Sequence, residues 1–207
     1  MNNEPGKLAT NSTTCKTGAL ILAAGMSSRM GAFKPLLKIG THTFVRRVIL
    51  TLQQAGASPV VLVTGNQAAL LERHVSGTGV VCIRNELYAS SQMLDSVVVG
   101  LRYLNGRCGQ VLLTPADIPM FSAETAQKLM NCGKPAAAPS YKGRKGHPLL
   151  LSCELIPFIE TYRGPGGLAG AIQASSQPVW MIEVDDEGIL LDADTPDDYE
   201  RLLLRER

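Results

Sequence analysis

The chain has little charge of either sign and few aromatic side chains. Charged residues make up 18% of its 207 positions and aromatic residues 5%, whereas average proteins carry about 25% charged residues. Twenty lysines and arginines oppose 18 aspartates and glutamates, so the formal net charge is only +2. This balance excludes a protein whose main task is to bind a nucleic-acid backbone, because that task needs a large basic surface. Any basic site must be local.

Long apolar runs and closely spaced cysteines are also missing. Runs such as 18–24 and 60–63 are far shorter than the about 20 residues that cross a bilayer, which excludes a membrane span. Residues 1–17 are polar and lack the features of a secretory signal, so we expect a disordered tail there. The five cysteines lie at least 21 positions apart, which excludes a CxxC site and favours a reducing, cytoplasmic location.

The remaining residues, 18–207, are expected to form one domain, because domains average about 150 residues and 45% of this chain is hydrophobic. Apolar runs of strand length alternate with segments of helical periodicity. Strands are expected at 18–24, 59–63, 79–83, 110–114, 136–139 and 179–184, an apolar segment at 147–151, and helices at 43–55, 67–74, 94–104, 123–130, 153–161, 168–174 and from 196. This alternation predicts an α/β fold: a single-domain, doubly wound, Rossmann-like three-layer sandwich. Its sheet should be mostly parallel, with an antiparallel excursion at the edge near the turn 142–146.

A loop rich in glycine, serine and cations follows the first strand. Segment 25–34 reads Gly-Met-Ser-Ser-Arg-Met-Gly-Ala-Phe-Lys, at the sheet edge where doubly wound folds bind ligands. Glycine lets backbone N–H groups approach phosphate oxygens, while Arg29 and Lys34 supply neutralising charge. The loop has neither P-loop nor GxGxxG spacing. The glycines alone would equally suit an ordinary strand-to-helix turn.

Residues 22–34 resemble the signature L-A-A-G-x-S-x-R-M-G-x-x-K of the MobA-like nucleotidyltransferases. The Ala-Ala-Gly start is more similar to the molybdenum cofactor cytidylyltransferases than to the guanylyltransferases. The resemblance implies a fold of the nucleotide-diphospho-sugar transferase type. It also implies that Arg29 and Lys34 hold the triphosphate and stabilise departing pyrophosphate. The residues that it implies around the nucleotide are Leu22, Ala23, Ala24, Gly25, Ser27, Ser28, Arg29 and Lys34.

Two aspartate segments are candidates for a metal site. Asp117 follows the strand 110–114 on a proline-containing loop, and Mg²⁺ prefers one or two carboxylates together with phosphates and water. An aspartate beside proline can also simply form a turn. The segment resembles the family's G-D-x-P metal motif, with Ala116 in place of glycine. Asp192-Ala-Asp194-Thr-Pro resembles the family's D-x-D-T-P segment, which implies Asp194 as the second metal ligand, with Asp192 as the alternative.

The residues after Asp194 have a structural interpretation. Thr195 is expected to be the N-cap of the last helix, with Pro196 at its first position. The aspartates at 197 and 198 would then complement the helix dipole.

Three further segments are candidates for contacts to nucleotide or acceptor. Segment 85–96 is similar to the family's N-x-x-[WY]-A stretch, which implies that Ser96 contacts the nucleotide; a helix-initiating serine is the alternative. The basic segment 141–148 contains a G-H-P-x-L resemblance, which implies that His147 lies on the acceptor side, unless it is a structural histidine. Gly166 and Gly167 precede a short helix and could bind an acceptor phosphate or simply connect two helices.

Together these residues predict a Mg²⁺-dependent nucleotidyltransferase. The resemblance implies CTP as donor, the phosphate of molybdenum-bound molybdopterin as acceptor, and an apo-molybdenum hydroxylase as a partner. Alternatives are a guanylyltransferase, a sugar- or polyol-phosphate nucleotidyltransferase of the same fold, or a non-catalytic molybdenum cofactor chaperone. A chaperone could lose the metal carboxylates, whereas this chain keeps Lys34, Asp117 and Asp194, which favours catalysis.

Overall fold

The computed structural model describes residues 16–25 and 32–206. Within them, eight strands form one sheet in the order β10-β7-β9-β6-β1-β4-β5, with β8 paired to β7 beside this path. The strands are β1 (Thr17–Ala23), β4 (Val60–Thr64), β5 (Val81–Arg84), β6 (Gln110–Pro115), β7 (Ala136–Tyr141), β8 (Arg144–Lys145), β9 (Leu149–Ser152) and β10 (Trp180–Glu183). The predicted α/β class is confirmed.

The sheet is mixed. β1 pairs in parallel with β4 and β6, β4 with β5, and β7 with β10. β9 is antiparallel to both β6 and β7 and lies between them. The main antiparallel strand is therefore inside the sheet, whereas the sequence predicted it at the edge. The connection from β7 through the short hairpin strand β8 is too short for a parallel crossover, which forces β9 to reverse direction. Its run of buried leucines, Leu149–Leu151, suits a strand covered on both faces.

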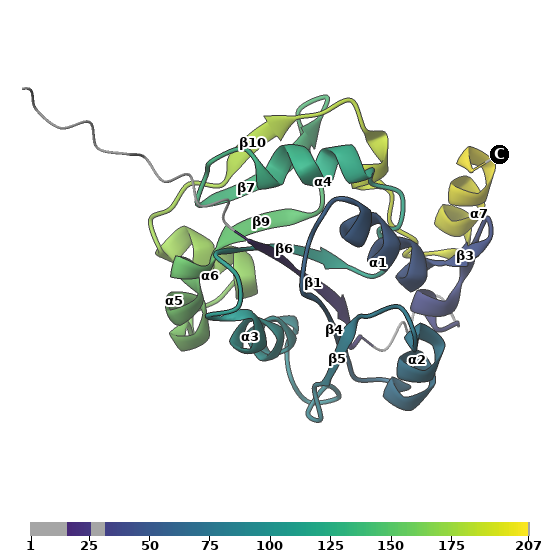
Figure 1. Cartoon of the computed structure of the whole chain (residues 1–207), viewed down its shortest axis with the longest axis horizontal. Helices are drawn as coiled ribbons and strands as arrows, with labels where there is room; N and C mark the ends of the chain where they lie inside the picture. The colour runs from purple at the N-terminus through teal and green to yellow at the C-terminus, as the bar shows by residue number, and fades with distance from the viewer. Residues whose placement is uncertain (1–15, 26–31, 207) are drawn as a thin grey trace, which may run out of the picture.

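Helices cover both faces of the sheet (Figure 1). One layer contains α1 (Phe44–Gln54), α2 (Ala68–Val75) and α4 (Ala123–Met130), and the other contains α3 (Met93–Leu104), α5 (Ile156–Thr161) and α6 (Gly167–Ala174). Alternating residues of β1 point to opposite layers: Ile21 packs in the α1 layer and Leu20 in the α3 layer. A Cβ at Gly100 of α3 would lie 2.2 Å from Leu20 Cδ1, so only glycine lets this helix approach the sheet so closely.

The C-terminal helix α7 (Pro196–Arg205) lies apart from these layers, beside the N-terminal part of α1 (Figure 1). Ile39, Phe44, Ala193 and Leu202 form a small core there. This core brings the segment before α7 to the edge of the sheet where β1 and β6 end. Short elements that the sequence analysis did not resolve lie nearby: the 3-10 helices η1 (Lys34–Leu36) and η3 (Glu187–Leu190) and the strands β2 (Lys38–Ile39) and β3 (His42–Thr43). A further 3-10 helix, η2 (Cys153–Leu155), leads into α5.

Helix termini follow the predicted chemistry. Thr195 is the N-cap of α7, where its hydroxyl accepts from the Asp198 N–H and the Asp198 carboxylate accepts from the Thr195 N–H. Gly56, just past α1, has a φ of +97°, the left-handed conformation that favours glycine after a helix. β1 begins at Thr17, which is buried, so the first strand starts one residue earlier than predicted. Residues 1–15 of the expected tail lie outside the described residues.

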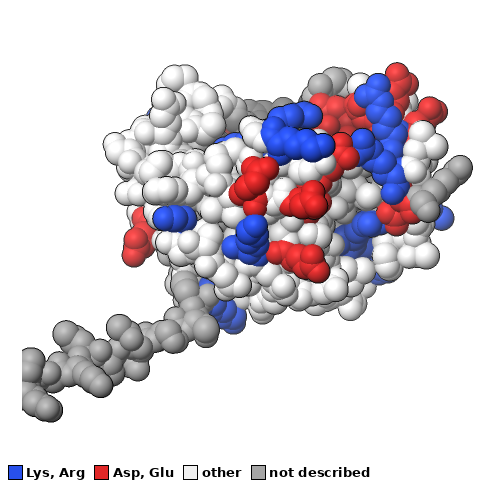
Figure 2. Space-filling model, turned by 90° about the horizontal axis from the view of Figure 1, so that it is seen from above, with Lys and Arg blue, Asp and Glu red and all other residues white. Residues whose placement is uncertain are grey.

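Among the described residues, no helix is both long and apolar enough to span a bilayer. On the face shown in Figure 2, basic and acidic side chains lie next to one another. This mixture agrees with the small net charge of +2.

Candidate active site

A cavity of about 230 Å³ opens at the sheet edge where β1 and β6 end. Its walls come from segments that are far apart in sequence: the end of β1, η1, the start of α3 and the loop after β6. The predicted site residues that line it are Leu22, Ala23, Ala24, Gly25, Lys34, Ser96 and Asp117. Of the predicted nucleotide-binding residues, Ser27, Ser28 and Arg29 lie outside the described residues. The structure therefore brings the described part of the expected nucleotide site together.

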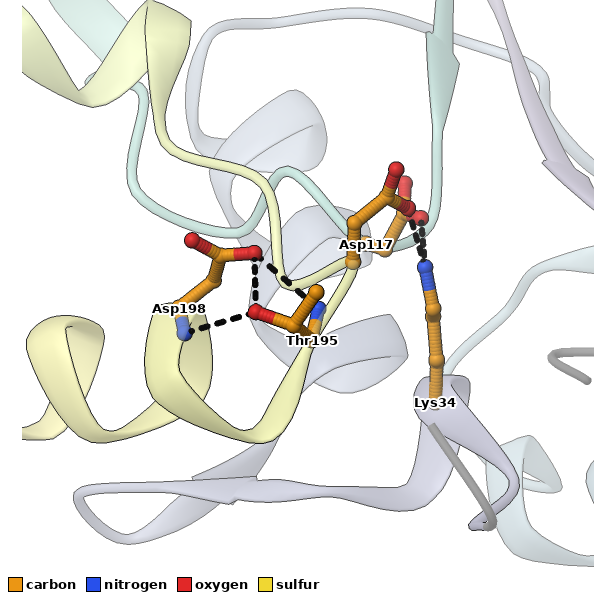
Figure 3. Close-up of polar contacts among 5 residues, drawn as sticks. Lys34, Asp117, Thr195 and Asp198 are labelled. Carbon is orange, nitrogen blue, oxygen red and sulfur yellow. Dashed lines mark hydrogen bonds and ion pairs between the residues drawn. The ribbon is translucent and has the colours of Figure 1, made fainter. Parts of the chain in front are cut away.

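Lys34 connects the cavity to the two predicted metal carboxylates. Its Nζ lies 3.3 Å from Asp117 Oδ2 and 2.5 Å from Asp194 Oδ1. The lysine is 8% exposed and the carboxylates are half-buried, so these ion pairs are partly shielded from water. In Figure 3 the Lys34 side chain extends from η1 towards Asp117, at the end of β6. One ammonium between two carboxylates leaves one net negative charge at the mouth of the cavity.

The acidic residues around Asp194 have distinct roles. Among the acidic residues of segment 192–198, Asp194 contacts the Lys34 ammonium. The pKa of Asp192 is raised, first by burial and then by the negative charges of Asp194 and Asp117. Asp198 instead turns towards Thr195 and caps α7 (Figure 3). The predicted N-cap at Thr195 is confirmed. Asp198 is engaged in this cap, whereas Asp194 faces Lys34.

The Asp117 and Asp194 carboxylates fit a magnesium site that a substrate completes. Both approach the same cation, the Lys34 ammonium, although they come from different segments of the chain. The described residues contain no group of three or more His, Cys, Asp or Glu side chains that could enclose a metal by themselves. A pair of carboxylates with remaining positions for phosphate oxygens and water is the arrangement that Mg²⁺ commonly accepts at nucleotide sites.

The wall formed by the start of α3 contains residues that the sequence analysis did not select. On this wall they are Tyr88, Ser91, Gln92 and Met93; elsewhere the cavity is also lined by Pro35, Pro115 and Ala116. Met93, the first residue of α3, is 71% exposed although it is large and apolar. The family resemblance of segment 85–96 implies a nucleotide contact for Ser96 alone; the aromatic Tyr88 in the same segment is the sequence signal for the rest of this wall. A Cβ at Gly65 would lie 2.6 Å from Tyr88 Cβ, so glycine at the end of β4 makes room for this wall.

His147 is half-buried beside β6. Burial lowers its pKa, while a backbone hydrogen bond with Leu113 and the charge of Asp117 act in the opposite direction. Its Nδ1 is buried and has no hydrogen-bond partner among the described residues. The preceding Gly146 packs against η3: a Cβ there would lie 2.5 Å from the Ile189 carbonyl oxygen. The histidine is thus held near Asp117, although it does not line the cavity.

Gly166 and Gly167 begin α6, where both have positive φ angles of +84° and +57°. The Tyr162 hydroxyl donates to the Pro165 carbonyl and holds this turn against α5. The residues that line the cavity do not include either glycine. Packing of α6 on α3 and α5 sets the position of the turn.

The sequence profile of the MobA-like NTP transferase domain matches residues 19–179, more than three quarters of the chain. The chain belongs to this family of nucleotidyltransferases. A molybdenum cofactor cytidylyltransferase of Escherichia coli strain K12 is 29% identical over 182 residues, which cover 87% of this chain and 92% of that protein. The resemblance predicted from residues 22–34 is confirmed at the level of the family.

Solved structures of similar proteins share the fold. Rv0371c from Mycobacterium tuberculosis H37Rv superposes with a TM-score of 0.78 at 27% identity, over 92% of this chain and 98% of that one. A complex of Rv0371c with manganese gives a TM-score of 0.74 at 24% identity, over the same shares of the two chains. The mixed α/β sandwich is therefore common to these proteins.

Proposed function

We propose that the chain transfers CMP from CTP to the phosphate of molybdenum-bound molybdopterin and releases pyrophosphate. The observation that carries this proposal is the position of the Lys34 ammonium between Asp117 and Asp194 at the mouth of the cavity. The similarity to the Escherichia coli molybdenum cofactor cytidylyltransferase supports the choice of CTP and of the pterin acceptor.

The chain's residues bind and orient the donor nucleotide in this account. Backbone groups of residues 22–25 and the Ser96 hydroxyl surround the nucleotide, as the cavity lining supports. Ser27, Ser28 and Arg29 belong to the same loop and are proposed to contact the triphosphate. Lys34 binds phosphate oxygens and offsets the charge of the departing pyrophosphate.

Asp117 and Asp194 would hold the divalent ion, which we propose to be Mg²⁺. When bound, the ion neutralises charge on the phosphates during transfer. The manganese complex of Rv0371c supports a divalent metal in this fold. With the carboxylates engaged in holding the ion, the Lys34 ammonium would be available to bind the phosphates.

The chemical step needs no protein nucleophile. An oxygen of the acceptor phosphate attacks the α-phosphorus of CTP, the bond from that phosphorus to the β-phosphate bridge breaks, and pyrophosphate leaves. The protein contributes alignment of the two substrates and compensation of negative charge. We propose His147 for the acceptor side, because the residue is near enough to Asp117 for their charges to interact and its Nδ1 has no hydrogen-bond partner among the described residues. Gly166 and Gly167 are proposed as N–H donors to the acceptor phosphate, and an apo-molybdenum hydroxylase as recipient of the product.

The proposal is tested by incubating the protein with Mg²⁺, molybdenum-loaded molybdopterin and CTP, GTP, ATP or UTP in separate reactions. Pyrophosphate and the dinucleotide are measured, the latter by mass spectrometry. We expect product with CTP at a rate at least tenfold above the other three nucleotides. A preference for GTP would overturn the choice of donor. If no pyrophosphate or dinucleotide forms with any of the four nucleotides, and turnover then occurs with a sugar 1-phosphate as acceptor, the choice of the pterin acceptor would be overturned.

A further inference from the structure

Asn85 is a buried amide behind the α3 wall of the cavity. It follows directly after β5 and is 5% exposed. Its backbone N–H donates to the Thr64 carbonyl at 2.8 Å, which ties it to the end of β4. Its side chain does not line the cavity, yet it contacts two residues that do.

The amide has one possible orientation. The Leu87 N–H donates to Asn85 Oδ1 at 3.1 Å. Because a backbone N–H can only donate, the oxygen must face Leu87 and the NH₂ group must face the other way. Asn85 Nδ2 then donates to Ser91 Oγ and to Ser96 Oγ, both at 2.9 Å. Both amide hydrogens are used.

This arrangement decides what the two serines can offer a ligand. A hydroxyl has one hydrogen to donate and lone pairs that accept. Each serine oxygen accepts from Asn85, which cannot accept in return, so each hydroxyl hydrogen must point elsewhere. Within the described residues, neither serine hydroxyl donates a hydrogen bond, and both serines line the cavity. Their hydrogens can therefore be directed into it.

We propose that Asn85 is a positioning residue that fixes Ser91 and Ser96 as hydrogen-bond donors to acceptor atoms of the bound nucleotide. The inference rests on the proposed nucleotide site and names the chemistry that this wall selects. Acceptor atoms of this kind occur on the base and ribose, as carbonyl, ring-nitrogen or hydroxyl atoms, and also on the phosphates. Donor groups of a ligand, such as a base amino group, are disfavoured at this wall.

A double-mutant cycle on nucleotide affinity tests the inference without the acceptor substrate. Affinities for CTP, GTP, ATP and UTP are measured by calorimetry, and the nucleotide that wild type binds most tightly is the probe. The variants are Asn85→Leu, the pair Ser91→Ala with Ser96→Ala, and all three together. We expect Asn85→Leu to weaken binding about tenfold, in line with the loss of one or two hydrogen bonds. The triple variant should bind no more weakly than the serine pair, because Asn85 acts only through those hydroxyls.

Two further variants separate positioning from folding. Asn85→Asp keeps the acceptor for the Leu87 N–H, but its second oxygen accepts from both serine hydroxyls, so their hydrogens turn away from the cavity. This variant should weaken nucleotide binding at least as much as Asn85→Leu. It replaces Asn85→Leu in the cycle if that variant does not fold. The matched control is Gln110→Leu. Gln110 Nε2 also donates twice, at 2.8 Å to Thr17 Oγ1 and to the Met130 carbonyl, but at the opposite end of β6. This control should lower the melting temperature and leave nucleotide affinity unchanged.

Two partial ligands show which acceptor atoms are involved. If the serines donate to the nucleoside, the serine pair of substitutions weakens binding of the free nucleoside and leaves inorganic tripolyphosphate unaffected; if they donate to phosphate, the reverse holds. Both results support the inference. The inference would be overturned if the triple variant lost affinity by the product of the losses in Asn85→Leu and in the serine pair. Unchanged nucleotide affinity in folded Asn85→Asp would also overturn it. GTP as the tightest ligand would overturn CTP as donor but would leave the role of Asn85 standing, whereas no binding of any nucleotide would overturn both.

Discussion

Lys34 and Asp194 lie 160 positions apart in sequence, yet the lysine Nζ is 2.5 Å from Asp194 Oδ1. The same ammonium reaches Asp117 Oδ2 at 3.3 Å. It therefore acts as an internal cation for two carboxylates. The 3-10 helix η1, the loop after β6 and the segment before α7 meet at this one charge.

Replacing Lys34 with alanine should make the protein more dependent on divalent ions. The substitution leaves two facing carboxylates without a cation, and we expect the free energy of unfolding to fall by about 1–3 kcal/mol, because the pair is only partly buried. Millimolar Mg²⁺ should restore part of this loss and should stabilise the variant more than wild type. Urea denaturation with and without MgCl₂ measures both effects.

Lys38→Ala is the control for this experiment, since Lys38 is exposed on the neighbouring strand β2. It should behave like wild type with and without Mg²⁺. An equal response of Lys34→Ala and wild type to Mg²⁺ would contradict a shared site at Asp117 and Asp194.

Asp186 should be important for stability and not for chemistry. Its carboxylate accepts from the Ser122 N–H at 2.8 Å, the Thr125 hydroxyl at 2.6 Å and the Gly188 N–H at 3.0 Å. These bonds join η3 to the start of α4. Asp186→Ala should lower the free energy of unfolding by about 2–3 kcal/mol, because three donors lose a charged acceptor. Denaturation of this variant beside Asp185→Ala, a change at an exposed neighbour, checks the value; equal stability of the two would refute the role.

Cys108 should react as a thiolate near neutral pH. Its sulfur lies 3.8 Å from that of Cys153, and this hydrogen bond is the largest cause that lowers the pKa of Cys108 from 9.0 to about 7. Its alkylation rate by iodoacetamide should therefore rise with pH to a half-maximum at about pH 7. Burial raises the pKa of Cys82, so the rate at that thiol should still be rising above pH 9.

Peptide mass spectrometry across the pH range follows both cysteines in one sample. Cys153→Ala should move the Cys108 midpoint upwards, because the thiolate loses its donor. Identical pH profiles for Cys108 and Cys82 would rule out the assigned hydrogen bond as the cause.

Much of the fold could be predicted because it depends on local patterns. The run 18–24 has the continuous apolar character of a strand buried on both faces, and β1 occupies nearly the same residues. Thr195 before Pro196 marked the start of α7. By contrast, the place of β9 in the sheet depends on which strands it pairs with, and the apolar segment 147–151 alone does not contain that information.

In the site, too, residues in local motifs could be predicted, whereas contacts that depend on tertiary packing could not. Lys34 and Asp117 were identified from their motifs, since phosphate and metal chemistry restrict the residue types that a site can use. The contact of Lys34 with Asp194 depends on the small core under α7, which joins Phe44 to Leu202. The amide of Asn85 was not selected because its function depends on two hydroxyls 6 and 11 positions away.

The most direct test of the account compares pyrophosphate release by wild type, Asp194→Asn and Asp197→Asn with CTP, Mg²⁺ and molybdenum-loaded molybdopterin. Asp197 lies in the first turn of α7 and is exposed, so its amide variant is a matched control for the same change of charge. We predict that Asp194→Asn loses at least a hundredfold in turnover while it stays folded, and that Asp197→Asn keeps wild-type activity. Turnover by Asp194→Asn equal to that of Asp197→Asn would contradict the assignment of this cluster as the catalytic centre.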